Sequence, residues 1–278
     1  MDAYFLPIIL TALFCGMGIS LLGVFIVGMR MPFIGSCLSH AAMVGAVAAA
    51  LVNQNPIIGA VLLSTAASGW AAFLPAHQNR LDANTGQAVL LAFLMGLVFL
   101  GVGIEQNRRS EMLALLWGNV LFAGWDTAAL SGLLFGLLIL FLTAFDGEMK
   151  AILFSRSLAA ATRPYSTLIY FLFLCLTGLM ISVTLQTVGG LLLFSLLVCP
   201  AAAAYLLGRG YRAVVFLAML FGVLSAGFGL VISYFLRLPT GACIVLVGTL
   251  FFLLAAGLKM LFHIRECGNE CCIEHKAG

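Results

Sequence analysis

Charged residues are scarce in this sequence. Only 8% of its 278 residues are Asp, Glu, Lys or Arg, whereas 63% are hydrophobic and the mean hydropathy is +1.17. A soluble domain typically carries about 25% charged residues. Because so little charge cannot cover a water-exposed surface of this size, the composition excludes a soluble globular domain. It predicts an all-α polytopic membrane protein whose main solvent is lipid.

Several motifs of other protein classes are also absent. No G-x-x-x-x-G-K-[ST] phosphate loop occurs, so we expect that this chain does not hydrolyse ATP itself. There is no H-E-x-x-H zinc-protease motif, and the eight cysteines form no regular disulfide framework. The first apolar stretch, Ala3 to Gly28, is too long for a cleaved signal peptide and lacks a basic segment before it.

Acidic residues are missing from the middle of the apolar segments. All ten lie at or near the expected helix ends and loops, whereas ion-coupled carriers commonly bury ionisable groups at mid-membrane. This pattern favours an energy source outside the chain. A secondary transporter stays open as an alternative, and an intramembrane enzyme is a weaker one.

Nine apolar runs are present, each long enough for a helix across a hydrocarbon core of about 30 Å. They cover about 4–28, 34–52, 56–75, 85–104, 126–145, 165–185, 188–207, 212–235 and 241–262. A tenth run, 112–123, is too short to span, and we interpret it as an interfacial or re-entrant helix. The sequence therefore predicts one transmembrane domain, 1–262, followed by a short tail, 263–278.

The basic residues predict the orientation, because Lys and Arg concentrate in cytoplasmic loops. With nine crossings and the N-terminus outside, ten of the 13 Lys and Arg residues fall inside: Arg30, Arg80, Lys150, Arg156, Arg163, Arg209, Arg212, Lys259, Arg265 and Lys276. Only Arg108, Arg109 and Arg237 fall outside. The sequence thus favours an N-out, C-in topology.

The longest polar connection, Asp146 to Arg163, then lies in the cytoplasm. It begins with helix-forming residues of both charge signs and ends before Pro164, which disfavours further helix. A short amphipathic helix here would offer a docking surface for a soluble partner. A solvated linker is the alternative interpretation.

His40 is the one ionisable side chain clearly inside an expected crossing. Ser36 lies four residues earlier and shares its helix face, while Cys37 lies on an adjoining position. Neutral imidazole is among the commonest metal ligands in proteins. A metal-binding role and a simple hydrogen bond to a neighbouring helix are both open at this point.

Four segments, in order along the chain, resemble the membrane permeases of zinc-, manganese- and iron-type ABC importers. The first is RMPFIGSCLSHAAMVG at 30–45, similar to the family's F-x-G-D-x-x-S-H-x-x-x-x-G. The others are LLWGNVLFAGWDTAAL at 115–130, VGGLLLFSLLVCPAAAAYL at 188–206 and LPTGACIVL at 238–246. Each match alone is weak, but together they extend over most of the chain.

The resemblance implies a multi-pass inner-membrane permease that catalyses no reaction and imports a divalent metal ion by alternating access. It implies a homodimer with a second permease copy, two cytoplasmic ATPase subunits that use ATP, and an extracytoplasmic metal-binding protein. It implies no permanently bound cofactor and no nucleic-acid partner. The segment 146–156 occupies the place of the family's coupling helix, where we expect these residues to face the ATPase: Asp146, Glu148, Lys150, Ala151 and Arg156.

One departure from the family concerns the cargo. The acidic residue that the family places four before the histidine is Ser36 here. A hydroxyl is a poor substitute for a carboxylate, so manganese becomes less favoured and zinc comes first, since nitrogen and sulfur donors suit softer ions. Cys37 and Cys199 are candidate thiolate ligands, although packing is the simpler role for both.

Two further features complete the prediction. Gly189, Gly190 and Pro200 predict a broken or kinked helix beside the pathway. The tail carries His263, Cys267, Cys271, Cys272 and His275, a possible cytoplasmic zinc site. On a straight helix the two histidines would lie about 18 Å apart, so one shared ion requires a bend, for example at Gly268. A disordered tail and a lipidation site are the alternatives.

Overall fold

The structure, a computed structural model, describes residues 2–73, 83–104 and 123–274. Every regular element within these ranges is a helix. The helices are α1 (Asp2–Gly28), α2 (Pro32–Leu51), α3 (Pro56–Phe73), α4 (Ala83–Ile104), α6 (Trp125–Ala144), α7 (Asp146–Phe154), α8 (Arg156–Thr162), α9 (Ser166–Val188), α10 (Gly190–Leu207), α11 (Tyr211–Leu236) and α12 (Thr240–Glu274). The predicted all-α class is confirmed.

The nine predicted runs each correspond to one long helix, with boundaries shifted by a few residues. Seven of the described helices are long and apolar enough to cross a membrane. The apolar parts of the other two, Pro56–Ala72 in α3 and Leu193–Leu207 in α10, are shorter. The expected interfacial helix at 112–123 lies outside the described residues, apart from its last position.

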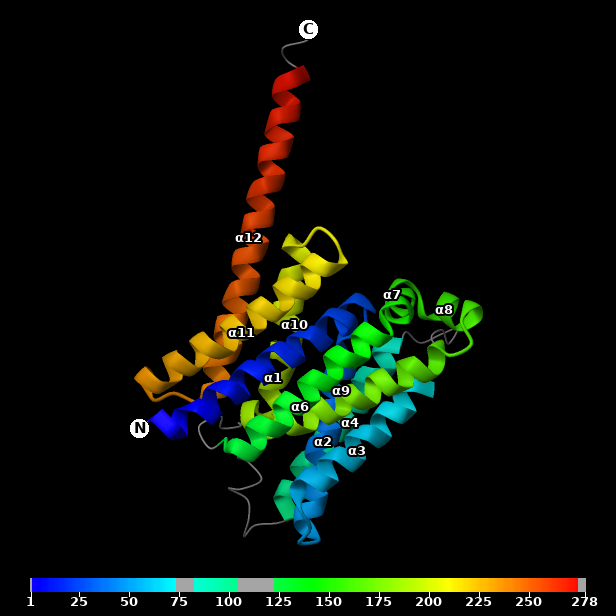
Figure 1. Cartoon of the computed structure of the whole chain (residues 1–278), viewed down its shortest axis with the longest axis vertical. Coiled ribbons are helices and arrows are strands. Elements are labelled where there is room, and N and C mark those ends of the chain that lie inside the picture. Colours follow the sequence, from blue (N-terminus) through cyan, green and yellow to red (C-terminus); the bar gives the residue numbers. More distant parts are fainter. Residues whose placement is uncertain (1, 74–82, 105–122, 275–278) are drawn as a thin grey trace.

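The long helices form two packed groups. In the first, α10 and α11 pack on each other, and both contact α1 and α12; in the second, α2 packs on α3 and α4, and α3 packs on α9 (Figure 1). Helix α9 lies between the groups, and its Phe173 ring meets the Phe25 ring of α1 at 5.5 Å between centroids. Both rings are fully buried, as is Tyr170 on α9. Aromatic side chains therefore join the two groups at the centre.

Glycine pairs allow the closest helix crossings. A Cβ atom added to Gly16 of α1 would lie 2.8 Å from the carbonyl oxygen of Gly222 on α11. Gly45 of α2 and Gly59 of α3 face each other in the same way, and a Cβ on either would overlap the other's carbonyl oxygen. Membrane helices lack a hydrophobic driving force between them, so close backbone packing at small residues holds them together.

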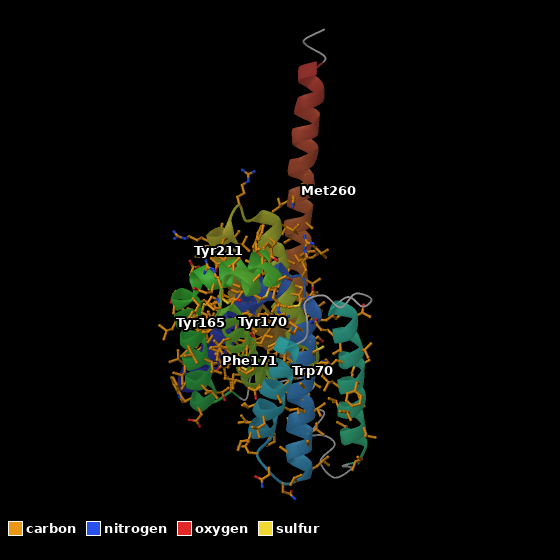
Figure 2. All side chains as sticks on the ribbon, turned by 90° about the vertical axis from the view of Figure 1, so that its right-hand side faces the viewer. Trp70, Tyr165, Tyr170, Phe171, Tyr211 and Met260 are labelled. Carbon is orange, nitrogen blue, oxygen red and sulfur yellow. The ribbon has the colours of Figure 1, made fainter. Side chains whose placement is uncertain are left out.

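The connections gather at two opposite ends of the bundle. Helices α7 and α8, the α10–α11 connection and the far end of α12 lie at one end, while the N-terminus and the α11–α12 connection lie at the other (Figure 1). The α1–α2 turn belongs to the first end, because Gly28 is adjacent to Leu153 of α7. Helix α12 continues past Met260 beyond the other helices (Figure 2).

Candidate functional site

His40 lies in the interior of the bundle, on α2. Its side chain is 5% exposed, and α2 is covered there by α3, α4, α9 and α10. The helix starts at Pro32, a residue suited to a first helical turn because it needs no amide donor. Arg30, with a φ of 59°, turns the chain from α1 into α2. The local sequence thus places the histidine two helical turns inside α2.

The hydrogen bond of the imidazole determines its tautomer. Nδ1 of His40 lies 2.9 Å from the carbonyl oxygen of Ser36. A carbonyl oxygen can only accept, so Nδ1 carries the proton and donates it. The Nε2 atom of the neutral ring then has a free lone pair. Nε2 is buried and has no hydrogen-bond partner among the residues that the structure describes.

This arrangement is the one found around metal-binding histidines. In such sites the second ring nitrogen donates to a backbone carbonyl or a carboxylate, which orients the ring and its metal-binding nitrogen. Here the helix itself supplies the carbonyl, one turn before the histidine. The imidazole is therefore held in an orientation suited to donate from Nε2 to a passing cation.

Ser36 and Cys37 differ from His40 in what they contribute. Ser36 supplies its backbone carbonyl, which also accepts a hydrogen bond from the Ser39 hydroxyl at 2.9 Å. The Cys37 thiol is buried and donates to the carbonyl oxygen of Gln87 on α4 at 3.0 Å. Cys37 thus faces the α2–α4 contact, and its thiol proton is engaged there.

Cys199 is also directed elsewhere. Its sulfur lies 3.8 Å from the Thr249 hydroxyl, so it takes part in the contact between α10 and α12. In the part of the chain that the structure describes, no three His, Cys, Asp or Glu side chains are close enough to hold one metal ion. Among the described residues, His40 thus leaves one buried side-chain nitrogen, Nε2, without a hydrogen-bond partner, whereas the Cys37 and Cys199 thiols have partners.

The predicted helix break falls at Gly189. This residue has a φ of 89° and a ψ of 145°, and it separates α9 from α10, which begins at Gly190. The positive φ explains the glycine. Helix α10 runs through Pro200 without interruption. The break predicted for the three residues together thus lies at the glycine pair, and Pro200 sits inside a continuous α10.

The segment 146–156, predicted as a coupling helix, contains α7 and the first residue of a second helix, α8, and its coupling role stays a prediction. Helix α7 ends at Phe154, Ser155 is extended with a φ of −161°, and Arg156 begins α8. The Ser155 hydroxyl accepts a hydrogen bond from the amide of Leu158, so it caps α8. The capping serine restarts the chain as a second helix instead of continuing the first, and the sequence reading missed this signal.

The charged residues of this segment are paired with one another and with aromatic rings. Lys150 binds Asp146 at 2.5 Å, and its ammonium lies 4.8 Å from the ring centre of Tyr211 on α11. Glu148 accepts from Arg163 at 3.3 Å. Ala151 is half-buried against the bundle. Of these contacts, the one between Lys150 and Tyr211 joins α7 to the first helix group.

Arg156 points into the bundle. It donates from Nη2 to the carbonyl oxygen of Ala72, in the last turn of α3, and its guanidinium lies 4.3 Å from the ring centre of Tyr170 on α9. Sequence reasoning placed this residue on the partner-facing surface and had no means of identifying Ala72 or Tyr170 as its contacts. Ala72 is 84 residues away in the sequence, and Tyr170 lies on the following helix.

Two exposed apolar side chains were also missed. Phe154 is 85% exposed at the end of α7, and Leu158 is 54% exposed on α8. Both lie in the polar segment that joins α6 to α9, where the residues expected to face the ATPase were four charged residues and Ala151. Exposed apolar residues grouped at such a place are typical of a protein interface.

The tail is helical as far as it is described. Helix α12 extends without interruption to Glu274, through Gly268, so the bend required for one shared ion is not formed there. Consecutive members of the set His263, Cys267 and Cys271 are four residues apart, about 6 Å along a helix axis. Their side chains, and all of His275, lie outside the described part. Metal binding by Cys267, Cys271, Cys272 and His275 stays a prediction.

The whole chain is similar to proteins of known type. A profile of the ABC 3 transport family matches residues 1–259. The manganese transport system membrane protein MntC of Listeria monocytogenes is 30% identical over 258 residues, which cover 89% of this chain and 88% of MntC. The high-affinity zinc uptake system membrane protein ZnuB of Haemophilus influenzae is 26% identical over 249 residues, covering 90% of this chain and 95% of ZnuB.

A solved structure has the same fold. PsaBC from Streptococcus pneumoniae, in complex with Fab, superposes with a TM-score of 0.78 at 23% sequence identity, over 91% of this chain and 90% of that chain. The likeness extends over nearly the full length of both chains. The two chains therefore share one fold.

Proposed function

Because the chain belongs to the ABC 3 transport family, we propose that it is the permease subunit of an ATP-driven importer of a divalent transition metal. Zinc is the first candidate, ahead of manganese and iron. The subunit is a multi-pass membrane protein. It moves its cargo by alternating access, using ATP hydrolysed by separate subunits, and it catalyses no reaction itself.

The observation that carries the proposal is the buried, preoriented imidazole of His40. Its Nδ1 is bound to the Ser36 carbonyl, and its Nε2 is left without a partner inside the described bundle. A buried polar atom without a hydrogen bond costs stability, typically about 1–3 kcal/mol. A metal ion passing along α2 would satisfy this atom, which gives the unpaired nitrogen a functional reason.

The proposal of zinc rests on the donor types around this histidine. A serine stands where the family has a carboxylate, and manganese prefers oxygen donors of that kind. Neutral imidazole suits zinc and other ions of intermediate softness. Relatives named for manganese and for zinc match the chain over similar lengths, so the argument depends on the site residues and not on the relatives.

We place the N-terminus outside and the C-terminus inside, with nine crossings. The positions of the basic residues within the described ranges support this orientation. Arg30, Lys150, Arg209 and Arg212 belong to the connections at the end of the bundle that carries α7 and α8, whereas Arg237 lies at the opposite end (Figure 1). The positive-inside rule then puts α7 and α8 in the cytoplasm.

In the proposed assembly two permease copies line a central pathway. Two ATPase subunits bind the α7–α8 segments from the cytoplasm, and an extracytoplasmic binding protein delivers the metal at the other face. Closure of the ATPase subunits would move α7 and α8. The helices around His40 would then change the side to which the pathway opens.

Uptake of zinc, manganese and iron isotopes into vesicles containing the reconstituted complex tests the proposal. We expect His40→Ala to lower zinc uptake by at least about tenfold, since even groups that only orient a ligand contribute 10- to 100-fold. Ser36→Asp should raise manganese uptake relative to zinc. Ser131→Ala is the matched control, because this buried serine lies on α6 and its hydroxyl donates to the carbonyl oxygen of Ala128.

Two outcomes would contradict parts of this proposal. Unchanged zinc uptake by His40→Ala would remove the site assignment and leave the permease assignment intact. Uptake by the purified chain without any ATPase subunit would instead indicate a secondary transporter. Co-purification distinguishes the two classes directly, because a permease subunit brings down a soluble ATPase and a self-sufficient carrier does not. An intramembrane enzyme would show a hydrolytic activity that His40→Ala abolishes while uptake persists.

A further inference from the structure

Arg156 joins three helices, α3, α8 and α9. It starts α8, donates to the Ala72 carbonyl at the end of α3, and stacks over the Tyr170 ring near the start of α9. Tyr170 is 1% exposed, so the guanidinium lies against a ring that is itself part of the core. We call Arg156, the Ala72 carbonyl and Tyr170 the arginine clamp.

We propose that Arg156 is a positioning residue for transport, which transmits movement of the α7–α8 segment through α3 and α9 to the helix that carries His40. This inference rests on the function proposed above, because it assumes that an ATPase subunit moves α7 and α8. It assigns to Arg156 a task inside the permease. It does not assign it a contact with the partner.

Helices α3 and α9 are held together by buried hydrogen bonds and close packing. The Ser64 hydroxyl of α3 bonds the Ser182 hydroxyl of α9 at 2.8 Å, and it also lies 3.2 Å from the carbonyl oxygen of Gly178. Ser64, Ser68 and Ser182 are fully buried. Gly178 packs directly against Ser68, where a Cβ would lie 2.8 Å from the hydroxyl oxygen. A force applied to the ends of α3 and α9 therefore moves the two helices as a pair.

Both α3 and α9 contact α2, the helix that carries His40. Helix α3 crosses α2 at Gly59 and Gly45, where the two backbones touch without side chains between them. Gly45 lies five residues after His40 on the same helix. A shift of α3 cannot be absorbed by side-chain rearrangement at a glycine–glycine crossing, so it displaces α2 and with it the imidazole.

The contacts at this position suit an arginine better than a lysine. A planar guanidinium can donate to a carbonyl and stack on an aromatic ring at the same time, which a lysine ammonium does less well. Lys150, in contrast, is 42% exposed and lies over Tyr211 of the first helix group. The two tyrosines belong to different helices of the bundle (Figure 2). The α7–α8 segment thus contacts the first helix group through Lys150 and the helices α3 and α9 through Arg156. Of these two contacts, only the one made by Arg156 is with helices that pack on α2.

The test measures ATP hydrolysed per zinc ion imported by the reconstituted complex. Arg156→Lys keeps the charge but weakens the stacked, forked contact, and Tyr170→Leu removes the ring from the other side. Tyr170→Phe keeps the ring and removes a hydroxyl that has no hydrogen-bond partner among the described residues. Arg212→Lys is the control, an exposed arginine near Tyr211 at the same end of the bundle.

We expect Arg156→Lys and Tyr170→Leu to raise the ratio of ATP to zinc by about 2- to 30-fold, the range in which single residues modulate coupling between sites. Both should still co-purify with the ATPase subunit. Tyr170→Phe and Arg212→Lys should keep the ratio of the unmodified complex. If one clamp variant fails to assemble, the other supplies the measurement.

Three results would overturn the inference. An unchanged ratio in both variants would show that the clamp transmits nothing. Loss of the ATPase subunit would make Arg156 a docking residue, and loss of folding in both variants would make the clamp a structural tie. If the unmodified complex imports zinc without hydrolysing ATP, the proposed function itself fails, which is a different outcome.

Discussion

At the scale of single residues, one hydrogen bond determines what His40 can do. The Ser36 carbonyl takes the proton of Nδ1, and Nε2 is left as a buried lone pair. Ser36 therefore contributes through its backbone, which any residue at this position could supply. The replacement of the family's acidic residue thus leaves the orientation of the histidine intact and changes only the second donor offered to the cargo.

Glycine at the α2–α3 crossing should be intolerant of even a methyl group. We expect Gly45→Ala to lower the free energy of unfolding by about 1–3 kcal/mol, as overpacking does elsewhere, because the new Cβ would overlap the Gly59 carbonyl. Gly96→Ala on α4 is the control, since no atom lies within 4 Å of its added Cβ. It should be neutral or stabilising by up to about 1 kcal/mol. Denaturant or thermal unfolding in detergent measures both.

Equal stability of these two variants would contradict the crossing. It would mean that α2 and α3 separate easily. A shift of α3 would then not be passed on to α2, as the arginine clamp requires. A lower unfolding temperature for Gly45→Ala alone would support both the close packing of α2 on α3 and the transmission of movement between them.

At the scale of elements, α7 and α8 form one unit with two faces. The inner face carries the buried Met149 and Ile152 together with Arg156. The outer face presents Phe154 and Leu158. Ser155 separates the two helices by capping the second, so the exposed phenylalanine stands at a bend. The charged residues of the segment are paired with one another or, for Arg156, with the bundle, which leaves Phe154 and Leu158 as exposed apolar side chains on this surface.

We therefore predict that Phe154 anchors the ATPase subunit. Phe154→Ala should weaken binding of the purified ATPase subunit to the permease by about 30-fold or more, the effect of losing an interface residue worth at least about 2 kcal/mol. Phe93→Ala is the control, because Phe93 is 62% exposed in the middle of α4, far from either end. Titration of the permease in lipid nanodiscs with the ATPase subunit measures the affinity. Equal affinities for the two variants would remove Phe154 from the interface.

At the scale of the whole molecule, orientation in the membrane decides whether a cytoplasmic ATPase subunit can bind α7 and α8. The α2–α3 connection and α8 lie at opposite ends of the bundle (Figure 1). An ATPase subunit can reach α7 and α8 only if that end faces the cytoplasm. The asymmetry of the basic residues supports this direction, since opposite ends of the described bundle carry unequal numbers of them.

Cysteine labelling in intact cells tests the orientation. In a background with the three tail cysteines changed to serine, Gln54→Cys should react with a membrane-impermeant maleimide, whereas Ser157→Cys should react only after the membrane is permeabilised. Both positions are exposed. The cysteines of the described region are buried or half-buried and should react slowly. Labelling of Ser157→Cys in intact cells would place α8 outside and end the proposal of a cytoplasmic ATPase partner.

The sequence alone determined the helical class, the approximate limits of the nine long helices and the polar character of the segment after residue 145. These follow from local chemistry: long apolar runs require helices in lipid, and clustered charge requires water. The motif around His40 and the glycine pair at 189–190 were also visible in the sequence. So was the proline within α10, although its helix proved to be continuous.

Only the tertiary structure decided which atoms meet. Helix packing leaves His40 Nε2 without a hydrogen-bond partner among the described residues, joins Cys37 to α4, and brings Arg156 to Ala72 and Tyr170. None of these contacts has a local sequence signal, since the partners lie on other helices. In a membrane bundle nearly every segment is apolar, so hydrophobic patterning cannot specify which faces touch. Backbone fit at small residues and a few buried polar bonds make that choice.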